Sequence, residues 1–140
     1  LTIDYYGVDI TQKMVDFTRA QGINVRQGSI ERIPLASATV DIAYARHILE
    51  HLVYYHRSID ELIRVARKEA LIVFFIKPTA SHDKLDLAYV NDMPLFHNHY
   101  NRTKLEKYVL SHQGVWHIEW EEISEQEEIL HIYLTKEEIS

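Results

Sequence analysis

Residues 70–76 read Ala-Leu-Ile-Val-Phe-Phe-Ile and form the most apolar stretch of the chain. A run of this length matches a strand that is buried on both faces, whereas a membrane-spanning helix needs about 20 apolar residues. Strands buried on both faces occur mainly in parallel sheets that are covered by helices. The stretch therefore predicts a central strand of an α/β sheet.

The sequence before this stretch alternates between strand and helix patterns. We expect three strands, at residues 3–10, 23–26 and 40–45. The helices that we expect are one that begins at a Thr11 cap and ends at Gly22, a helical turn at 48–53 and an amphipathic helix at 57–68. The apolar stripe of the last helix repeats at three and four residues and consists of Ile59, Leu62, Ile63 and Ala66.

The sequence after residue 76 predicts an irregular segment, a helix and two strands. Residues 79–102 carry Pro94 and many polar groups, and a capping box at 103–106 opens a helix that ends near Gly114. Trp116, Ile118 and Trp120 alternate with polar residues, and so do Leu130, Ile132 and Leu134, with a turn at 124–127 between them. We therefore predict a Rossmann-like three-layer sandwich whose mostly parallel sheet ends in an antiparallel hairpin.

Composition excludes several classes of function. The net charge is −6, with 15 basic against 21 acidic residues, so the chain lacks the basic footprint of a nucleic-acid binder. No uncharged apolar run reaches 18 residues, which predicts no membrane span. The absence of cysteine rules out disulfides, thiolate nucleophiles and zinc–cysteine sites, and it fits the cytoplasmic location that we expect. A small molecule is the expected substrate, and the acidic residues near the C-terminus are interpreted as a solvated face.

The end of the first expected strand carries a candidate binding residue. Ligands of open α/β sheets bind outside the carboxyl ends of the strands. Asp9 leaves the strand there, and a carboxylate can accept hydrogen bonds from both hydroxyls of a ribose, while Ile10 offers an apolar surface to an adenine ring. Alternatively, Asp9 joins Thr11 in capping the next helix.

Three segments together resemble the class I S-adenosylmethionine-dependent methyltransferases of the small-molecule type. They are, in order, Val8-Asp9-Ile10, Gly28-Ser29-Ile30 with Ile33-Pro34, and His47-Ile-Leu-Glu-His-Leu52. The resemblance implies S-adenosylmethionine as cofactor and methyl transfer to a small-molecule acceptor by in-line displacement. It also implies that Asp9 holds the ribose and Ile10 the adenine, that Ser29 and the Ile30 amide face the adenine edge, and that the Ala45 and Arg46 backbone lines the methionine end.

One position departs from the family pattern within these segments. The family usually has an aspartate where Ser29 stands, and that aspartate accepts a hydrogen bond from the exocyclic amine of the adenine. A serine hydroxyl also accepts such a bond, but without the charge that makes hydrogen bonds to carboxylates roughly twice as strong. We therefore expect weaker adenine recognition in this chain.

The resemblance places histidines near the acceptor. His47 follows a strand end and is the candidate general base, or else a residue that starts and packs the helical turn. His51 is expected to be structural, and Arg46 binds an acidic acceptor or pairs with Glu50. Residues 92–100 would form a lid over the acceptor. His97 and His99 in this lid lack a supporting carboxylate, so we expect no metal site.

The family's Gly-X-Gly-X-Gly loop is not found in this sequence. The four glycines are Gly7, Gly22, Gly28 and Gly114, and the first residue is Leu1 rather than Met. We therefore expect residues 1–140 to form a single, N-terminally truncated methyltransferase domain whose first strand is missing. That strand would lie between the strands of Tyr5 and Val40, so we expect two unpaired edges. The lone chain is then expected to form a homodimer through these edges, to rearrange, or to be only marginally stable.

Two other functions stay open at this stage. The first is a catalytically inactive methyltransferase-like fragment that acts as a binding or assembly module. The second is a nicotinamide-dependent oxidoreductase, against which the terminal hairpin and the segment at 47–52 argue. Because oxygen, nitrogen, carbon and sulfur acceptors all occur on this fold, the sequence leaves the acceptor and the activity of these 140 residues open.

Overall fold

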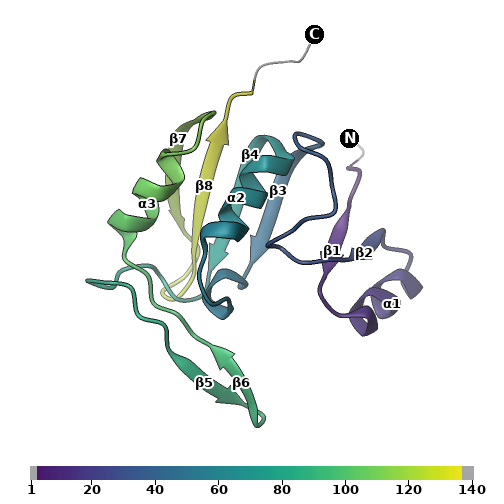
Figure 1. Cartoon of the computed structure of the whole chain (residues 1–140), viewed down its shortest axis with the longest axis horizontal. Coiled ribbons are helices and arrows are strands. Elements are labelled where there is room, and N and C mark those ends of the chain that lie inside the picture. The colour runs from purple at the N-terminus through teal and green to yellow at the C-terminus, as the bar shows by residue number, and fades with distance from the viewer. Residues whose placement is uncertain (1–2, 137–140) are drawn as a thin grey trace.

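The computed structural model describes residues 3–136 and contains strands, three α-helices and one 3₁₀-helix (Figure 1). The helices are α1 (Gln12–Ala20), η1 (Leu49–His51), α2 (His56–Val65) and α3 (Arg102–Leu110). The strands are β1 (Gly7–Asp9), β2 (Val25–Gln27), β3 (Val40–Arg46), β4 (Ala66–Phe74), β5 (Leu87–Val90), β6 (Met93–Phe96), β7 (Val115–Glu122) and β8 (Glu128–Leu134). None of the helices within residues 3–136 is long and apolar enough to cross a membrane.

The strands form three separate sheets. The largest has the order β3-β4-β8-β7, in which β3 and β4 are parallel and the other two pairings are antiparallel. Strands β1 and β2 form a short parallel pair, and β5 and β6 form an antiparallel hairpin. The predicted α/β fold with a closing antiparallel hairpin, β7–β8, is therefore confirmed. The largest sheet is mixed and not mostly parallel as predicted, because β8 pairs antiparallel with both β4 and β7.

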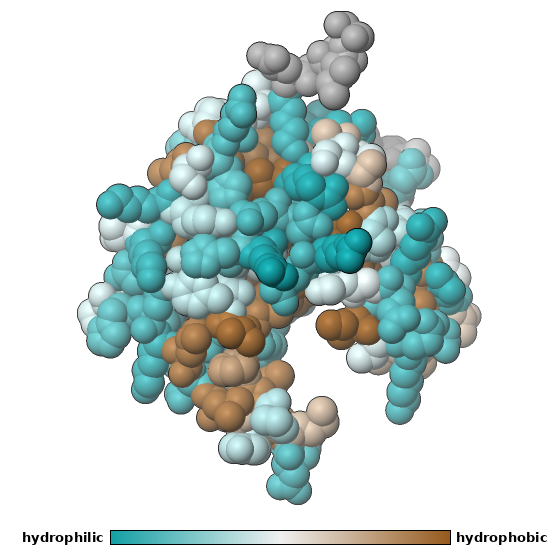
Figure 2. Space-filling view, viewed as in Figure 1, coloured by the Kyte–Doolittle hydropathy of each residue, from teal (hydrophilic) through white to brown (hydrophobic). Residues whose placement is uncertain are grey.

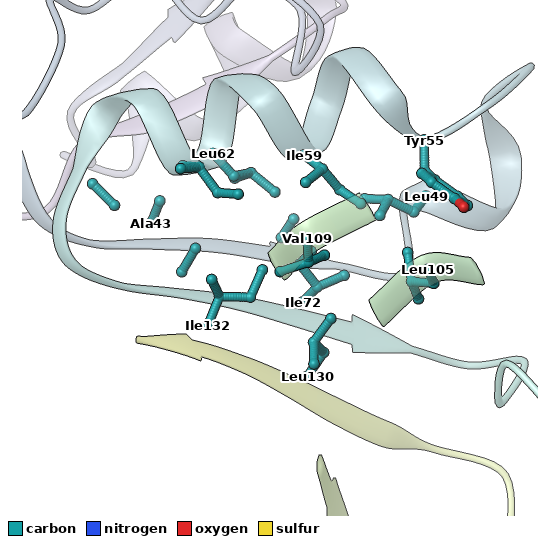
Figure 3. Close-up of a cluster of buried hydrophobic side chains, with 14 of the residues drawn as sticks. Ala43, Leu49, Tyr55, Ile59, Leu62, Ile72, Leu105, Val109, Leu130 and Ile132 are labelled. Atoms are coloured by element: carbon teal, nitrogen blue, oxygen red, sulfur yellow. The ribbon is translucent and has the colours of Figure 1, made fainter. Parts of the chain in front are cut away.

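The hydrophobic core lies between the largest sheet and helices α2 and α3. Figure 3 shows Ile59 and Leu62 of α2 directed at the side chains of β4 and β8, with Leu105 and Val109 of α3 beside them. The predicted apolar stripe is confirmed for Ile59, Leu62 and Ile63, which are buried on α2, while Ala66 is buried as the first residue of β4. Within residues 3–136, α1 packs on β1 and β2 instead of on the largest sheet, so the three-layer arrangement stays a prediction.

Two predicted strand boundaries are wrong. The strand expected at 3–10 is regular only at Gly7–Asp9, because β2 offers partners to these three residues alone. The helix expected at 57–68 ends at Val65, and β4 begins at Ala66, which pairs with Val40 of β3. No glycine or proline separates α2 from β4, so the sequence carries no local signal for this boundary.

The helix caps match the predictions in part. Thr11 caps α1 as expected, since its side chain accepts a hydrogen bond from the Met14 amide at 3.3 Å. Val15 is the buried residue of α1, whereas the Met14 side chain is 46% exposed. Helix α3 begins two residues earlier than its capping box implied, because Asn101 instead of Thr103 is the cap and accepts the hydrogen bond from the Lys104 amide at 2.9 Å.

The hairpin β5–β6 lies in the segment that was expected to be irregular. Its turn residues Asn91 and Asp92 have φ values of 52° and 63°. Asparagine and aspartate tolerate this left-handed conformation, which two-residue hairpin turns of type I′ require. Pro94 suggested a loop, but as a residue of a two-stranded hairpin it sits on an edge strand, where a missing amide hydrogen is tolerated.

Strand β7 departs from the predicted alternation at its first residues. The register between β7 and β8 shifts between Val115 and His117. Such a bulge changes the face to which the following side chains point. Trp116 is consequently 64% exposed, whereas Ile118 and Trp120 are half-buried as expected.

Truncation of Ile72 to alanine should lower the free energy of unfolding by about 2–5 kcal/mol, because Ile72 is fully buried between β3, β8 and the helices. The neighbouring Leu71→Ala is the matched control, since Leu71 is only half-buried on the other face of β4 and should cost clearly less. Urea unfolding followed by circular dichroism measures both values. Equal losses would contradict the placement of the core.

Candidate functional site

The β1–β2 pair and the edge strand β3 face each other across an apolar cavity of about 300 Å³. Its walls include Tyr5, Val8, Ile30, Ile33, Tyr44 and Ile48. On the same side of the molecule, Figure 2 shows the surface hollowed between the β5–β6 hairpin and the unit formed by β1, α1 and β2. The carboxyl ends of β1, β2 and β3, and the residues that follow them, carry the site residues that the sequence singled out.

Asp9 is the last residue of β1 and uses one carboxylate oxygen to cap α1. Its Oδ1 atom accepts hydrogen bonds from the Thr11 amide at 2.9 Å and from the Thr11 hydroxyl at 3.1 Å. The capping role considered as an alternative is therefore real. Within residues 3–136, Oδ2 of Asp9 has no hydrogen-bond partner, so one acceptor oxygen stays available to a ligand. Ile10 beside it is 69% exposed.

The structure brings the segment around Ser29 next to Asp9. Asp9 pairs with Gln27 across the β1–β2 ladder, and the Asp9 carbonyl accepts a hydrogen bond from the Gly28 amide at 2.9 Å. The Ser29 hydroxyl oxygen accepts a hydrogen bond from the Glu31 amide at 3.1 Å. Ile30 is half-buried and lines the cavity. Four of the predicted cofactor residues thus lie close together, and we call them the Asp9 cluster: Asp9, Ile10, Ser29 and Ile30.

Ala45 and Arg46 lie at the end of β3, and neither lines the cavity. Ala45 is buried, while Arg46 is exposed and its Nη2 atom is 3.7 Å from Glu127 Oε1. Within residues 3–136, no hydrogen bond or ion pair joins either residue to the Asp9 cluster. The structure therefore shows no direct polar contact between the two groups of predicted cofactor residues in this part of the chain.

His47 follows β3 in a left-handed backbone conformation, with φ of 56°. Its ring packs edge-on against Phe75 at a centroid distance of 5.3 Å, and its Nε2 atom is buried 2.7 Å from Glu127 Oε1. The approach is close but poorly aligned for a hydrogen bond, so it acts as an ion pair when the imidazole is protonated. The catalytic role of His47 remains a prediction.

Glu127 was missed as a site residue. The acidic C-terminal residues were interpreted as a solvated face, yet Glu127 is half-buried against Arg46 and His47, and Glu128 is buried and ion-paired with Arg102. These partners are about 80 and 26 residues away in the sequence, so no local spacing signals the contacts. The β7–β8 turn is what carries Glu127 to the end of β3.

Glu50 has a different role from the predicted pairing with Arg46. It is fully buried, and its Oε2 atom accepts hydrogen bonds from the amides of Phe75 at 2.6 Å and Ile76 at 3.1 Å. Arg46 instead approaches Glu127, so the suggested Arg46–Glu50 pair is wrong. Burial raises the pKa of the Glu50 carboxyl, and the backbone hydrogen bonds offset only part of this effect.

The histidines of the predicted lid do not form a metal centre in the described part of the chain. His97 lies beside the rings of His51 and Phe75, at centroid distances of 5.3 and 5.8 Å. His99 exchanges backbone hydrogen bonds with Lys84, and Asn98 between them is buried. Residues 3–136 contain no group of three or more histidines and carboxylates arranged to hold a metal ion.

The family was established by comparison with a sequence model of the methyltransferase domain, which matches residues 1–74, more than half of the chain. This chain belongs to the class I S-adenosylmethionine-dependent methyltransferase family. S-adenosylmethionine is the cofactor of that family. No curated protein matches the chain.

Solved structures show the same fold as this methyltransferase domain at low sequence identity. A protein from Pyrococcus horikoshii is 13% identical, with a TM-score of 0.68 over 94% of this chain and 72% of that one. An S-adenosylmethionine-dependent methyltransferase from Mesorhizobium loti is 11% identical, with a TM-score of 0.66 over 91% and 79%. The 1,6-didemethyltoxoflavin-N1-methyltransferase of Burkholderia thailandensis is 12% identical, with a TM-score of 0.61 over 94% and 61%.

Glu50 should make the stability of the methyltransferase domain depend on pH. Because its folded-state pKa lies above the ordinary value of 4.5, its contribution is fully present below pH 4.5 and is lost as the pH rises through the folded-state pKa. Glu50→Gln keeps an acceptor for the Phe75 and Ile76 amides but carries no charge, so it should remove this loss.

Thermal unfolding of both proteins between pH 4 and pH 8 measures this effect, with pH steps on the order of half a unit. Glu125→Gln is the control, because Glu125 is exposed and its substitution should leave the pH dependence of stability unchanged. Parallel curves for the parent protein and Glu50→Gln would contradict the assignment.

Proposed function

We propose that this chain takes part in transfer of a methyl group from S-adenosylmethionine to a small-molecule acceptor by in-line displacement. Family membership supports this proposal, and so does the meeting of Asp9 and Ser29 at the carboxyl ends of neighbouring parallel strands. When bound, S-adenosylmethionine supplies an electrophilic methyl group on a sulfonium sulfur. The residues then have to bind, align and desolvate the two reactants, because alignment provides much of the rate.

The residues at the ends of β1 and β2 fit the adenosine part of the cofactor. Oδ2 of Asp9 is available to accept a hydrogen bond from a ribose hydroxyl, and the exposed side chain of Ile10 can cover one face of the adenine. The neutral Ser29 hydroxyl and the Ile30 amide would meet the adenine edge. We propose that the backbone of Ala45 and Arg46, at the end of β3, lines the methionine end.

The acceptor would lie beyond the ends of β3 and β4, where His47 packs on Phe75. Glu127 and Phe75 hold the His47 ring from two sides, which supports a role for His47 in shaping the acceptor site. The segment 92–100, which includes strand β6, would cover the acceptor. A small-molecule acceptor is consistent with the Burkholderia relative, whose structure holds 1,6-didemethyltoxoflavin and S-adenosylhomocysteine.

Strands β1 and β3 are not paired with each other, and this supports a second proposal, which concerns self-association of the chain. Within the described residues, β3 pairs only with β4, and its Ile42 and Tyr44 side chains are 54% and 58% exposed at the cavity. We propose that residues 1–140 act as one domain and that two copies associate through the open edges of β1 and β3. A binding or assembly module without catalysis is the corresponding second candidate function.

Asp9→Asn should weaken binding of S-adenosylhomocysteine roughly tenfold, because a charge-assisted hydrogen bond becomes a neutral one. The asparagine oxygen still caps α1 through Thr11, so the fold should be kept. Isothermal titration calorimetry measures the affinity, and Asp16→Asn on the exposed side of α1 is the matched control. Equal affinities for parent and Asp9→Asn would contradict the ribose assignment.

Replacement of both Ile42 and Tyr44 by lysine should abolish self-association, because the charges would have to be buried at the paired edges. Sedimentation velocity over a range of protein concentrations distinguishes monomer from dimer. Trp116→Lys is the control, since Trp116 is similarly exposed but lies on β7, away from the cavity. A parent protein that stays monomeric at every concentration would rule out the dimer.

A further inference from the structure

Four rings meet where β3, β4 and β6 end. Phe75 lies between the rings of His47, His51 and His97, at centroid distances of 5.3, 5.1 and 5.8 Å. The His51 and His97 rings are themselves 5.3 Å apart. All four side chains are half-buried, so the group is accessible from one side. A planar aromatic molecule is the ligand that such a set of rings packs against best.

The hydrogen bonding of His51 fixes where its proton sits. Its Nδ1 atom is 2.8 Å from the carbonyl oxygen of Phe96 on β6. A backbone carbonyl only accepts hydrogen bonds, so Nδ1 must carry the hydrogen. In the neutral ring the other nitrogen, Nε2, therefore presents a lone pair. Within residues 3–136, that Nε2 atom has no hydrogen-bond or ion-pair partner.

His47 differs from His51 in this respect. Its Nε2 atom is buried and is covered by Glu127 at 2.7 Å. An acceptor molecule cannot deliver a proton to this nitrogen unless Glu127 moves away. Of the two histidines near the strand ends, His51 is the one whose Nε2 atom is not covered by a carboxylate within residues 3–136.

Further polar groups lie next to His51 in the sequence and in space. Glu50 precedes it and holds a buried carboxyl group, whose Oε1 atom has no hydrogen-bond partner within residues 3–136. The other titratable groups that face His51 are His97 on the β6 side and His47 across Phe75. Tyr100, whose hydroxyl donates to the Leu49 carbonyl, packs beneath η1 and keeps this turn in place.

We propose that His51 is the general base of the reaction, and that it serves a planar aromatic acceptor whose nucleophile carries a proton, such as a phenol. This inference rests on the proposed methyl transfer. The Nε2 lone pair takes the hydroxyl proton, which leaves an imidazolium on the protein and a phenolate oxygen as nucleophile. Phe75 and His97 pack against the acceptor ring, and Glu127 keeps His47 oriented beside it.

The state of His51 can be tested before any acceptor is known. Long-range ¹H–¹⁵N NMR spectra of the histidine rings should show the Nδ1–H tautomer for His51 at neutral pH. Diethyl pyrocarbonate, followed by peptide mapping, should modify His51 faster than His47, because only unprotonated and accessible ring nitrogens react. An Nε2–H tautomer, or a reactive His47 beside a protected His51, would overturn the proposal.

The acceptor class can be tested with 2-naphthol as the probe. Added to the protein with S-adenosylhomocysteine, it should shift the NMR signals of His51 and Phe75. With S-adenosylmethionine, its methylation should fall about 10²–10⁴-fold in His51→Gln, which keeps a donor for the Phe96 carbonyl. His117→Gln is the control, because His117 is exposed on β7.

The outcomes distinguish failure of the proposed methyl transfer from failure of the acceptor class or of the role of His51. Failure of the parent protein to bind S-adenosylhomocysteine would contradict the proposed function itself. Binding of S-adenosylhomocysteine without any methylation of 2-naphthol would overturn the phenolic class. Equal methylation rates in His51→Gln and the parent protein, with equal cofactor affinity, would overturn the role of His51.

Discussion

Strand β4 is hydrogen-bonded along both of its edges, and this pairing sets the positions of the neighbouring strands, the helices and the site. Hydrogen bonds to β3 on one edge and to β8 on the other fix three strands in register. Ile72 of β4 lies between Ala45 of β3 and Leu130 of β8. Because the fully buried Ala70, Ile72 and Phe74 line one face, α2 and α3 must pack there to keep them from water. The same register sets Arg46 beside Val73 and so brings His47 to Phe75.

Polar contacts connect the three paired strands to η1 and to the β5–β6 hairpin. The Glu50 carboxylate oxygen binds the two amides that follow β4, which holds η1 against the strand end. The hydrogen bond of His51 to the Phe96 carbonyl joins η1 to β6. The side-chain amide of the buried Asn98 donates to the Leu52 carbonyl, and its backbone amide donates to the Glu50 carbonyl. The β5–β6 hairpin is therefore anchored at its base to the turn that carries the histidines, although its tip has no such support.

Much of the fold could be predicted because its signals are local. The run at 70–76, the stripe of α2 and the alternation of β8 each depend on side chains a few residues apart. The clustering of Asp9 with Ser29 followed from the rule that parallel strands share a carboxyl edge. The end of α2 at Val65 was not predictable, because pairing of Ala66 with Val40 overrides a helical pattern that continues to Lys68.

The polar detail of the site escaped prediction for a related reason. Glu127 reaches His47 only through the β7–β8 turn, and Glu50 turns inward to amides that have no side-chain signature. The sequence offered Arg46 and Glu50 as neighbours four residues apart, but β3 and η1 are not one helix, so that spacing does not bring them together. Contacts between segments far apart in the chain decide which carboxylate meets which base.

The left-handed backbone of His47 has a consequence for how this chain can evolve. A side chain at φ of 56° costs on the order of 1 kcal/mol relative to glycine, which adopts this conformation freely. A mutation to glycine would thus relax the junction between β3 and η1 while deleting the ring that Phe75 and Glu127 hold. A substitution that relaxes the backbone at this residue therefore also removes the contacts of the ring, so the two cannot be improved together.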